Sequence, residues 1–100
     1  MDIETASRQL DAIGNPTRLR IYRALVRAGE TGAPVGQIQE TLGLPASTLS
    51  HHLRKLLEVG LIRQARSGTT LQCHAEYPAM KALVAFLVDE CCADDASQAG

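Results

Sequence analysis

The chain has 100 residues and a formal net charge of −1, with 45% hydrophobic and only 3% aromatic residues. This length suits one small domain, not a large multidomain enzyme, and its core must be built from Leu, Val, Ile and Ala. No apolar run approaches the roughly 20 residues of a membrane span, and the acidic start Met1–Glu4 carries no secretory signal. We therefore expect a cytoplasmic protein with reduced thiols.

Helical periodicity dominates the first 28 residues. A first helix is predicted over residues 3–13, with one apolar face made of Ile3, Ala6, Leu10 and Ile13. Gly14 ends it, Asn15 can cap a second helix, and Pro16 suits the first position of that helix. The inner face of the second helix is expected to consist of Leu19, Tyr22, Leu25 and Val26. Residues 29–33 are predicted to be a loop.

Two further helices are joined by a tight turn. Pro34 suits the first turn of the third helix, whose apolar stripe is Val35, Ile38 and Leu42. Gly43–Leu44–Pro45 predicts the turn, because Gly43 tolerates a positive φ and Pro45 can start the next helix. The fourth helix is predicted over Ala46–Val59, with Gly60 as its C-terminal cap.

The fourth helix has two contrasting faces. The inner stripe contains Leu49, His52, Leu53, Leu56 and Leu57, which makes His52 a core histidine. The opposite face and the first turn carry short hydrogen-bonding and cationic side chains, namely Ser47, Thr48, Ser50, His51, Arg54 and Lys55. Such a face can enter a major groove and contact base edges and phosphates. The alternative is an ordinary helical hairpin with a solvated polar face.

A β-hairpin is predicted directly after the fourth helix. Its strands are Leu61–Arg66 and Thr69–Ala75, with Ser67–Gly68 as the turn. A helix-turn-helix followed by such a hairpin predicts a winged helix-turn-helix, mainly α with a small β-hairpin, in the order α-α-α-α-β-β-α. Arg66 is placed to meet a phosphate or the minor groove. Arg63 and Arg66 also suit edge strands that resist aggregation, and we expect both uses.

The last helix is predicted to begin at Tyr77–Pro78. Its apolar stripe consists of Met80, Leu83, Val84, Leu87, Val88 and Cys91. The domain is expected to span residues 1–92, followed by a flexible tail over residues 93–100. Because the apolar stripes at both ends of the chain lack a partner in so small a fold, we expect a dimer.

Charge is unevenly distributed along the chain. Residues 16–66 carry eight basic and three acidic side chains, whereas residues 67–100 carry one basic and five acidic ones. A basic middle and an acidic end favour a DNA-facing surface and a remote regulatory end.

The sequence resembles the ArsR/SmtB family of metal- and metalloid-responsive repressors. The resemblance covers roughly residues 3–92 and rests on Ile13–Ile21, Ser47–Leu53, Gly60–Ile62 and Gly68. It implies a homodimer that pairs its first and last helices, binds an inverted-repeat DNA operator and leaves DNA when an effector binds. By position, the residues matching the family's DNA-contacting face are Ser47, Thr48, Ser50, His51 and Arg54.

The resemblance also implies where an effector would bind. One arsenic site of the family uses cysteines at the start of the third helix, where this chain has Val35–Gln37. A zinc site along the last helix needs histidine, which residues 79–92 lack. Some arsenic-responsive members carry an adjacent cysteine pair at the end of the last helix, and Cys91 and Cys92 match it. The third cysteine of that site has no counterpart in residues 93–100.

Thiolate chemistry leaves several effector hypotheses open. Trivalent arsenic or antimony would bind the soft thiolates of Cys91 and Cys92, with a hydroxide or an exogenous thiol as third ligand. Cys73 could be that ligand if the fold brings it close, although a strand-packing role is expected for it. Zinc held by Cys73, His74, Cys91 and Cys92 is an alternative metal site. His74 otherwise suits an exposed strand position.

The remaining alternatives concern the cysteines without a metalloid. Cys91 alone could be a small buried hydrophobe, which is a common role for a free cysteine. The pair could sense oxidants or electrophiles by forming a reversible disulfide. A small thiol enzyme is disfavoured, because no Cys-X-X-Cys and no nucleophile–base set occur. No resident cofactor is expected.

Overall fold

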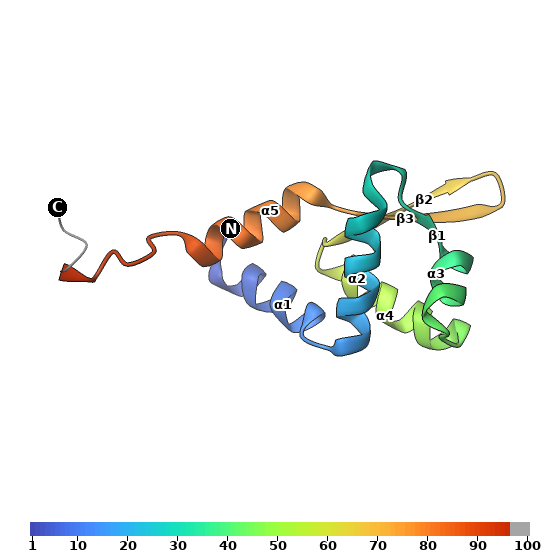
Figure 1. Cartoon of the computed structure of the whole chain (residues 1–100), viewed down its shortest axis with the longest axis horizontal. Helices are drawn as coiled ribbons and strands as arrows, with labels where there is room; N and C mark the ends of the chain where they lie inside the picture. The colour runs from blue at the N-terminus through green and yellow to red at the C-terminus, as the bar shows by residue number, and fades with distance from the viewer. Residues whose placement is uncertain (97–100) are drawn as a thin grey trace.

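The computed structural model describes residues 1–96 of the chain. Its elements in chain order are α1 (Ile3–Ile13), α2 (Pro16–Ala28), the short 3₁₀ helix η1 (Gly29–Thr31), β1 (Ala33–Pro34), α3 (Val35–Leu42), α4 (Ala46–Glu58), β2 (Ile62–Ser67), β3 (Thr70–Ala75) and α5 (Tyr77–Val88). The molecule is elongated, with principal extents of 57 × 23 × 21 Å. Helices α1 and α5 lie side by side at one end, and the β2–β3 hairpin projects at the other (Figure 1).

Side-chain caps and glycine fix the helix boundaries near the predicted positions. The Asp2 carboxylate accepts a hydrogen bond from Thr5 N (2.8 Å), and the Asn15 amide oxygen accepts one from Arg18 N (3.0 Å). These contacts satisfy backbone donors that the first turn of a helix leaves unpaired. Gly43 has φ 63° in the turn between α3 and α4, a left-handed conformation that favours glycine. The predicted helix-turn-helix is therefore confirmed.

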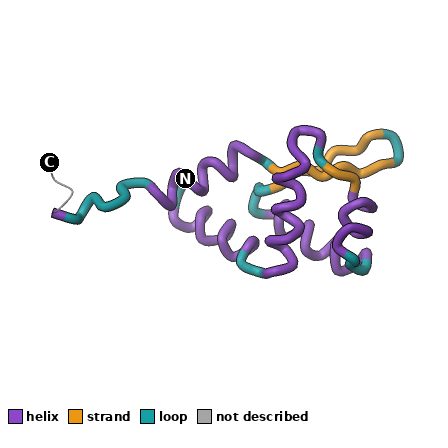
Figure 2. Tube along the Cα trace, viewed as in Figure 1, coloured by secondary structure: helices purple, strands orange, loops and turns teal. Residues whose placement is uncertain are grey.

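The hairpin is part of a three-stranded antiparallel sheet in the order β1-β3-β2 (Figure 2). The two-residue strand β1 pairs Ala33 with Cys73, whereas the sequence predicted a loop there. Ser67 pairs with Thr70, so the hairpin turn lies at Gly68–Thr69, one residue later than predicted. Gly68 has φ 62° and occupies the first position of this turn, where two-residue hairpin loops favour a positive φ.

One apolar core joins α2, α3, α4 and the sheet. Its largest fully buried side chains are Ile21, Leu25, Leu49, Leu56, Leu61 and Cys73. The strand-packing role expected for Cys73 is thereby confirmed. The prediction that Leu19 lines the inner face of α2 is wrong, since Leu19 is 42% exposed and Ile21 is fully buried. Residues two apart on a helix point about 200° apart, so burial of Ile21 turns Leu19 outward.

The last helix ends earlier than the apolar pattern predicted. Helix α5 stops at Val88, and Asp89 is extended, with ψ 136°. Glu90 and Cys92 then have positive φ values of 56° and 64°. Cys91 is consequently exposed and does not extend the buried stripe, so the buried-hydrophobe interpretation of Cys91 is wrong. Of the predicted tail, residues 93–96 are exposed, and residues 97–100 lie outside the described part.

Helices α1 and α5 leave large apolar side chains in solvent. The exposed members on these helices or beside them are Met1, Ile3, Leu10, Val84, Leu87 and Val88. Ile3 is 70% exposed and Val88 60%, values far from those of core residues. We call this set the α1/α5 apolar face. In the described part of the chain, no helix is both long enough and apolar enough to cross a bilayer.

Replacing Leu56 with alanine is predicted to destabilise the fold strongly. The Leu56 side chain is fully buried, so its truncation leaves a cavity and should lower the free energy of unfolding by roughly 2–5 kcal/mol. The matched control is Leu19→Ala, at a position that is 42% exposed, with an expected loss under about 1 kcal/mol. Urea unfolding followed by circular dichroism at one fixed protein concentration measures both. Equal losses in the two variants would contradict this assignment of the core.

Candidate DNA-binding surface and candidate thiol site

The outward face of α4 carries the polar residues that the sequence singled out. Burial of Leu49, Leu53 and Leu56 on the inner side turns the other side of the helix toward solvent. The exposed side chains on that side are Ser47, Ser50, His51, Arg54 and Lys55, and Thr48 is half-buried. These side chains offer hydroxyl, imidazole and cationic hydrogen-bond donors along more than two turns of one helix. Contacts to base edges and phosphates in a major groove require donors of these kinds.

The hairpin lies next to this face of α4. A cavity of about 230 Å³ lies between them and is lined by Ser50 and Arg54 of α4, Gln64 of β2 and Leu71 of β3, among others. Arg66 is exposed near the tip of the hairpin. The predicted base-contacting helix and the predicted phosphate-contacting hairpin therefore border one groove.

The two arginines of β2 differ in their surroundings. Arg63 forms an ion pair with Glu76, with 3.0 Å between Nη1 and Oε1, at the start of α5. This pair is partly exposed, so its contribution to stability is small. Among the described residues, the structure records no such partner for Arg66. Arg66 is thus available to an external anion, whereas Arg63 already contacts a carboxylate.

His52 is half-buried and has a polar partner that the sequence did not reveal. Arg18 of α2 donates from Nη1 to His52 Nδ1 at 3.2 Å and from Nε to the Ala12 carbonyl at 2.6 Å. A guanidinium has no acceptor, so His52 must keep a lone pair on Nδ1 and carry its proton on Nε2. Burial, together with the charges of Arg18 and His51, lowers the pKa of His52 below its ordinary value of 6.5.

Cys91 and Cys92 form an exposed pair just beyond α5. Their sulfur atoms are 3.5 Å apart. Backbone hydrogen bonds from Cys91 N to Val88 O (3.0 Å) and from Ala93 N to Glu90 O (2.9 Å) hold this segment in successive turns. On a regular helix, adjacent side chains diverge by about 100°, so the end of the helix before Cys91 allows the thiols to converge.

Cys73 does not join this pair. It is fully buried in β3, where Gln64 Nε2 donates to its sulfur at 3.4 Å. Burial raises the pKa of the Cys73 thiol, which disfavours the thiolate that a metalloid would bind. His74, beside it, has Nδ1 3.2 Å from the Glu30 carbonyl.

Residues 1–96 bring no three His, Cys, Asp or Glu side chains together as a metal site. The third-ligand role for Cys73 and the four-residue zinc set are therefore not supported, because core packing holds the strand residues apart from the exposed pair.

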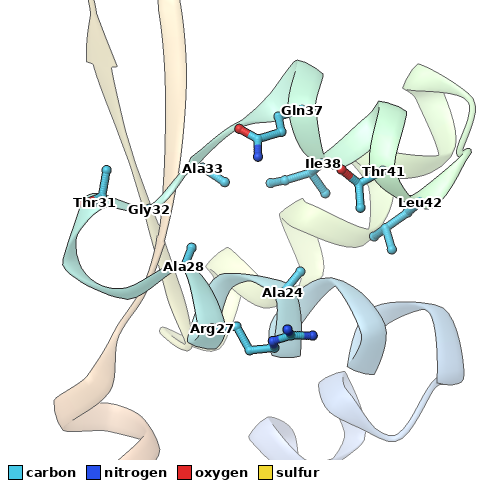
Figure 3. Close-up of a pocket in the computed structure, with 10 residues that line it drawn as sticks. All are labelled: Ala24, Arg27, Ala28, Thr31, Gly32, Ala33, Gln37, Ile38, Thr41 and Leu42. Carbon is cyan, nitrogen blue, oxygen red and sulfur yellow. The ribbon is translucent and has the colours of Figure 1, made fainter.

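A larger cavity lies on another side of the molecule. It has a volume of about 460 Å³ and lies between α2 and α3 (Figure 3). Its lining includes Ala24, Arg27, Ala28, Gln37 and Thr41, and none of the three cysteines contributes to it. Any ligand of the cysteine pair would therefore bind outside this cavity.

Known proteins are similar to this chain in sequence and in architecture. Residues 13–65 match the family described as "Helix-turn-helix domain". The transcriptional regulator YgaV of Escherichia coli (strain K12) is 32% identical over 89 residues, which cover 89% of this chain and 88% of YgaV. The chain belongs to this family of helix-turn-helix transcriptional regulators.

Solved structures of similar regulators agree with this assignment. The crystal structure of NolR from Sinorhizobium fredii has a TM-score of 0.69 and 30% identity, covering 86% of this chain and 83% of NolR. A domain of a possible ArsR-family regulator from Mycobacterium bovis, described as a homodimeric winged helix-turn-helix, has a TM-score of 0.69 and 26% identity, covering 88% of this chain and 82% of that one. The predicted winged helix-turn-helix fold of this regulator is confirmed.

Burial of His52, together with its contact with Arg18, is predicted to make stability depend on pH. Because the folded state lowers the pKa of His52, its contribution to stability is present above about pH 6.5 and is lost as pH falls through the lower folded pKa. The thermal midpoint of the wild type should therefore fall between about pH 7 and pH 5 more than that of His52→Gln. The control His51→Gln, at an exposed neighbour, should retain most of the drop. Equal pH dependence in the wild type and His52→Gln would contradict this assignment.

Proposed function

We propose that this regulator is a dimeric repressor that binds an inverted-repeat operator and leaves DNA when trivalent arsenic or antimony binds Cys91 and Cys92. The observation that carries the effector part is the pair of exposed sulfur atoms 3.5 Å apart at the end of α5. Membership of the helix-turn-helix regulators, together with similarity to a possible ArsR-family regulator of known structure, supports the regulatory part.

DNA contact is assigned to two elements. The outer face of α4 offers Ser47, Ser50 and His51 for base edges, and Thr48 at the first turn adds a hydroxyl. Arg54 and Lys55 supply charge for phosphates, and Arg66 does the same at the hairpin. The partner is therefore double-stranded DNA, read by one helix and held by the hairpin.

The α1/α5 apolar face supports a homodimer. Exposed side chains such as Ile3, Leu87 and Val88 belong to α1 and α5. These two helices lie side by side at the end of the molecule away from the hairpin (Figure 1). Exposed apolar side chains on neighbouring helices favour an interaction site. A two-fold pairing through it would present two α4 helices to the two halves of an inverted repeat. The homodimeric state of the similar Mycobacterium bovis domain agrees with this pairing.

The thiol pair suits a soft trivalent ion. When two thiols replace two hydroxyls of arsenous acid, each new As–S bond releases one water, and the third hydroxyl stays on arsenic. An exogenous thiol can then replace that hydroxyl. The chelate needs both sulfur atoms, and its formation at the end of α5 would disturb the adjacent α1/α5 apolar face. The two α4 helices of the dimer would then lose the spacing that the operator requires.

A second candidate function is release by oxidation. The distance of 3.5 Å between the sulfur atoms favours a disulfide between Cys91 and Cys92, in which an oxidant takes two electrons and the thiols lose two protons. Diamide would then release DNA and a thiol reductant would restore binding. Arsenite acts on the reduced protein, so the two treatments separate the candidates.

Arg54→Ala is predicted to weaken DNA binding and reduce its salt dependence. Each phosphate contact releases counterions, so loss of one should lower the slope of log K against log salt by about 1. Fluorescence anisotropy on the chain's own upstream DNA measures both quantities. Arg23→Ala, an exposed arginine of α2, is the matched control and should keep the wild-type slope. An unchanged slope in Arg54→Ala would exclude a phosphate contact.

Cys92→Ser is predicted to leave DNA binding intact and to abolish release by arsenite. Loss of one thiolate destroys the chelate, so the arsenite concentration for half-release should rise by at least about tenfold, equivalent to about 1.4 kcal/mol. The control Cys73→Ala removes a thiol that is fully buried and should respond like the wild type. Full release of Cys92→Ser at wild-type arsenite concentrations would show that the pair is not the sensor.

A further inference from the structure

Gln9 is a polar side chain on the buried side of α1, between the buried residues Ala6 and Ala12. It is 5% exposed, and its Nε2 donates to the Val59 carbonyl at 3.0 Å. Its Oε1 is buried and has no hydrogen-bond partner in the part of the chain that the structure describes. The side chain thus makes one bond across 50 positions of sequence and leaves its second polar atom unpaired.

The acceptor of this bond lies at the end of the proposed DNA-reading helix. Val59 is the C-terminal cap of α4, and Gly60, with φ 75°, turns the chain toward Leu61 and β2. Gln9 therefore ties the end of α4 to α1. The outer side of α1 carries Ile3 and Leu10 of the α1/α5 apolar face, so one helix contacts both the proposed dimer surface and the proposed DNA-reading helix.

Glutamine gives little net stability here. Its Nε2 satisfies the Val59 carbonyl, but burial of the unpaired Oε1 offsets that gain, whereas an unbranched apolar side chain would lose the bond and avoid the cost of the unpaired oxygen. Polar groups that break the packing rules in this way are expected where a position serves function. The bond from Gln9 to Val59 is directional, and an apolar contact could not fix the end of α4 as narrowly.

We propose that Gln9 is a positioning residue that fixes the orientation of α4 relative to α1 and thereby sets the half-site spacing that the dimer accepts. This inference rests on the proposed DNA-binding dimer. A second contact, from Arg18 to His52, holds the middle of α4. Gln9 fixes the C-terminal end, so loss of its bond should loosen the angle of α4 without detaching the helix.

The experiment uses Gln9→Met, which keeps an unbranched side chain of similar length and removes the donor and the unpaired oxygen. The control is Gln37→Met, the same change at an exposed position of α3, where Figure 3 shows the side chain beside the α2–α3 cavity. Binding is measured on the operator and on operators with one base pair added or removed between half-sites. One base pair rotates a half-site by roughly 35°, which makes spacing a sensitive readout.

The wild type and Gln37→Met should bind the altered operators about tenfold or more weakly than the natural one. Gln9→Met should discriminate by less than about threefold, with a thermal midpoint and a dimer dissociation constant at or near the wild-type values. Hydrogen exchange of backbone amides in residues 56–61 should be faster in Gln9→Met alone.

Three results would overturn the proposal. A lower thermal midpoint with unchanged spacing preference would make Gln9 merely structural. A weaker dimer with unchanged spacing preference, once the dimer is saturated, would place its role at the interface. Unchanged exchange in residues 56–61 would remove the link to α4. The exchange experiment needs no DNA, so a wild type that fails to bind its upstream DNA would count against the proposed function and not against this link.

Discussion

Burial of the leucine stripe of α4 is the constraint from which the geometry of the molecule follows. Leu49 and Leu56 are fully buried and Leu53 is 3% exposed. Each such side chain stabilises the fold by about 1.5–3 kcal/mol, far more than any exposed polar contact. Because the helix turns 100° per residue, this burial leaves the positions opposite the stripe no place except solvent. The polar face of α4 is thus oriented by apolar packing, and its side chains remain free to bind.

Helices α1 and α5, in contrast to α4, carry more apolar surface than the core buries. A domain of 100 residues has a small core, and the core here is filled by α2, α3, α4 and the sheet. The apolar stripes of α1 and α5 exceed what that core can cover, as the 55–60% exposure of Val84, Leu87 and Val88 shows. Such a surface is unfavourable in water unless another apolar surface covers it. The proposed dimer surface and the hairpin proposed to contact DNA therefore lie at opposite ends of an elongated molecule.

Local patterns predicted most of the fold, since caps, glycine turns and apolar periodicity act over a few residues. Asn15, Gly43 and the two faces of α4 lie where their sequence contexts indicated. Strand β1 escaped prediction because two residues carry no periodicity and its formation depends on pairing with β3. The end of α5 was misplaced because the apolar pattern continues to Cys91, whereas the backbone turns at Asp89.

The two polar contacts on α4 left no sequence signal at all. Gln9 and Val59 are 50 residues apart, and Arg18 and His52 are 34 apart, so only the folded chain brings them together. Cys91 and Cys92, by contrast, are recognisable as an adjacent pair in the sequence. Only the turn after Val88, however, accounts for the convergence of their two sulfur atoms.

The position of the thiol pair bears on how an effector would release DNA. Cys91 and Cys92 are exposed. They belong to the segment that follows α5, which extends away from the hairpin (Figure 1), so a metalloid bound there would not directly block the outer face of α4 in the same copy. Release would therefore require the metalloid to bind more tightly to the arrangement of the dimer that cannot hold DNA than to the arrangement that can. Each tenfold loss of DNA affinity would need a difference of about 1.4 kcal/mol between these two metalloid-binding free energies.

Metalloid binding can supply this difference in affinity only if formation of the chelate changes the conformation of the segment that holds the two thiols. Cys92 has φ 64°, a conformation unfavourable for a residue with a side chain, and the turns around it connect directly to α5. A metalloid that draws the two sulfur atoms into one coordination sphere would act on this strained segment, which directly follows Leu87 and Val88 of the α1/α5 apolar face along the chain and is bonded to Val88 O through Cys91 N. In the proposed mechanism, the path from effector to DNA would run through the pairing of two copies and the orientation of α4 on α1, not through the core.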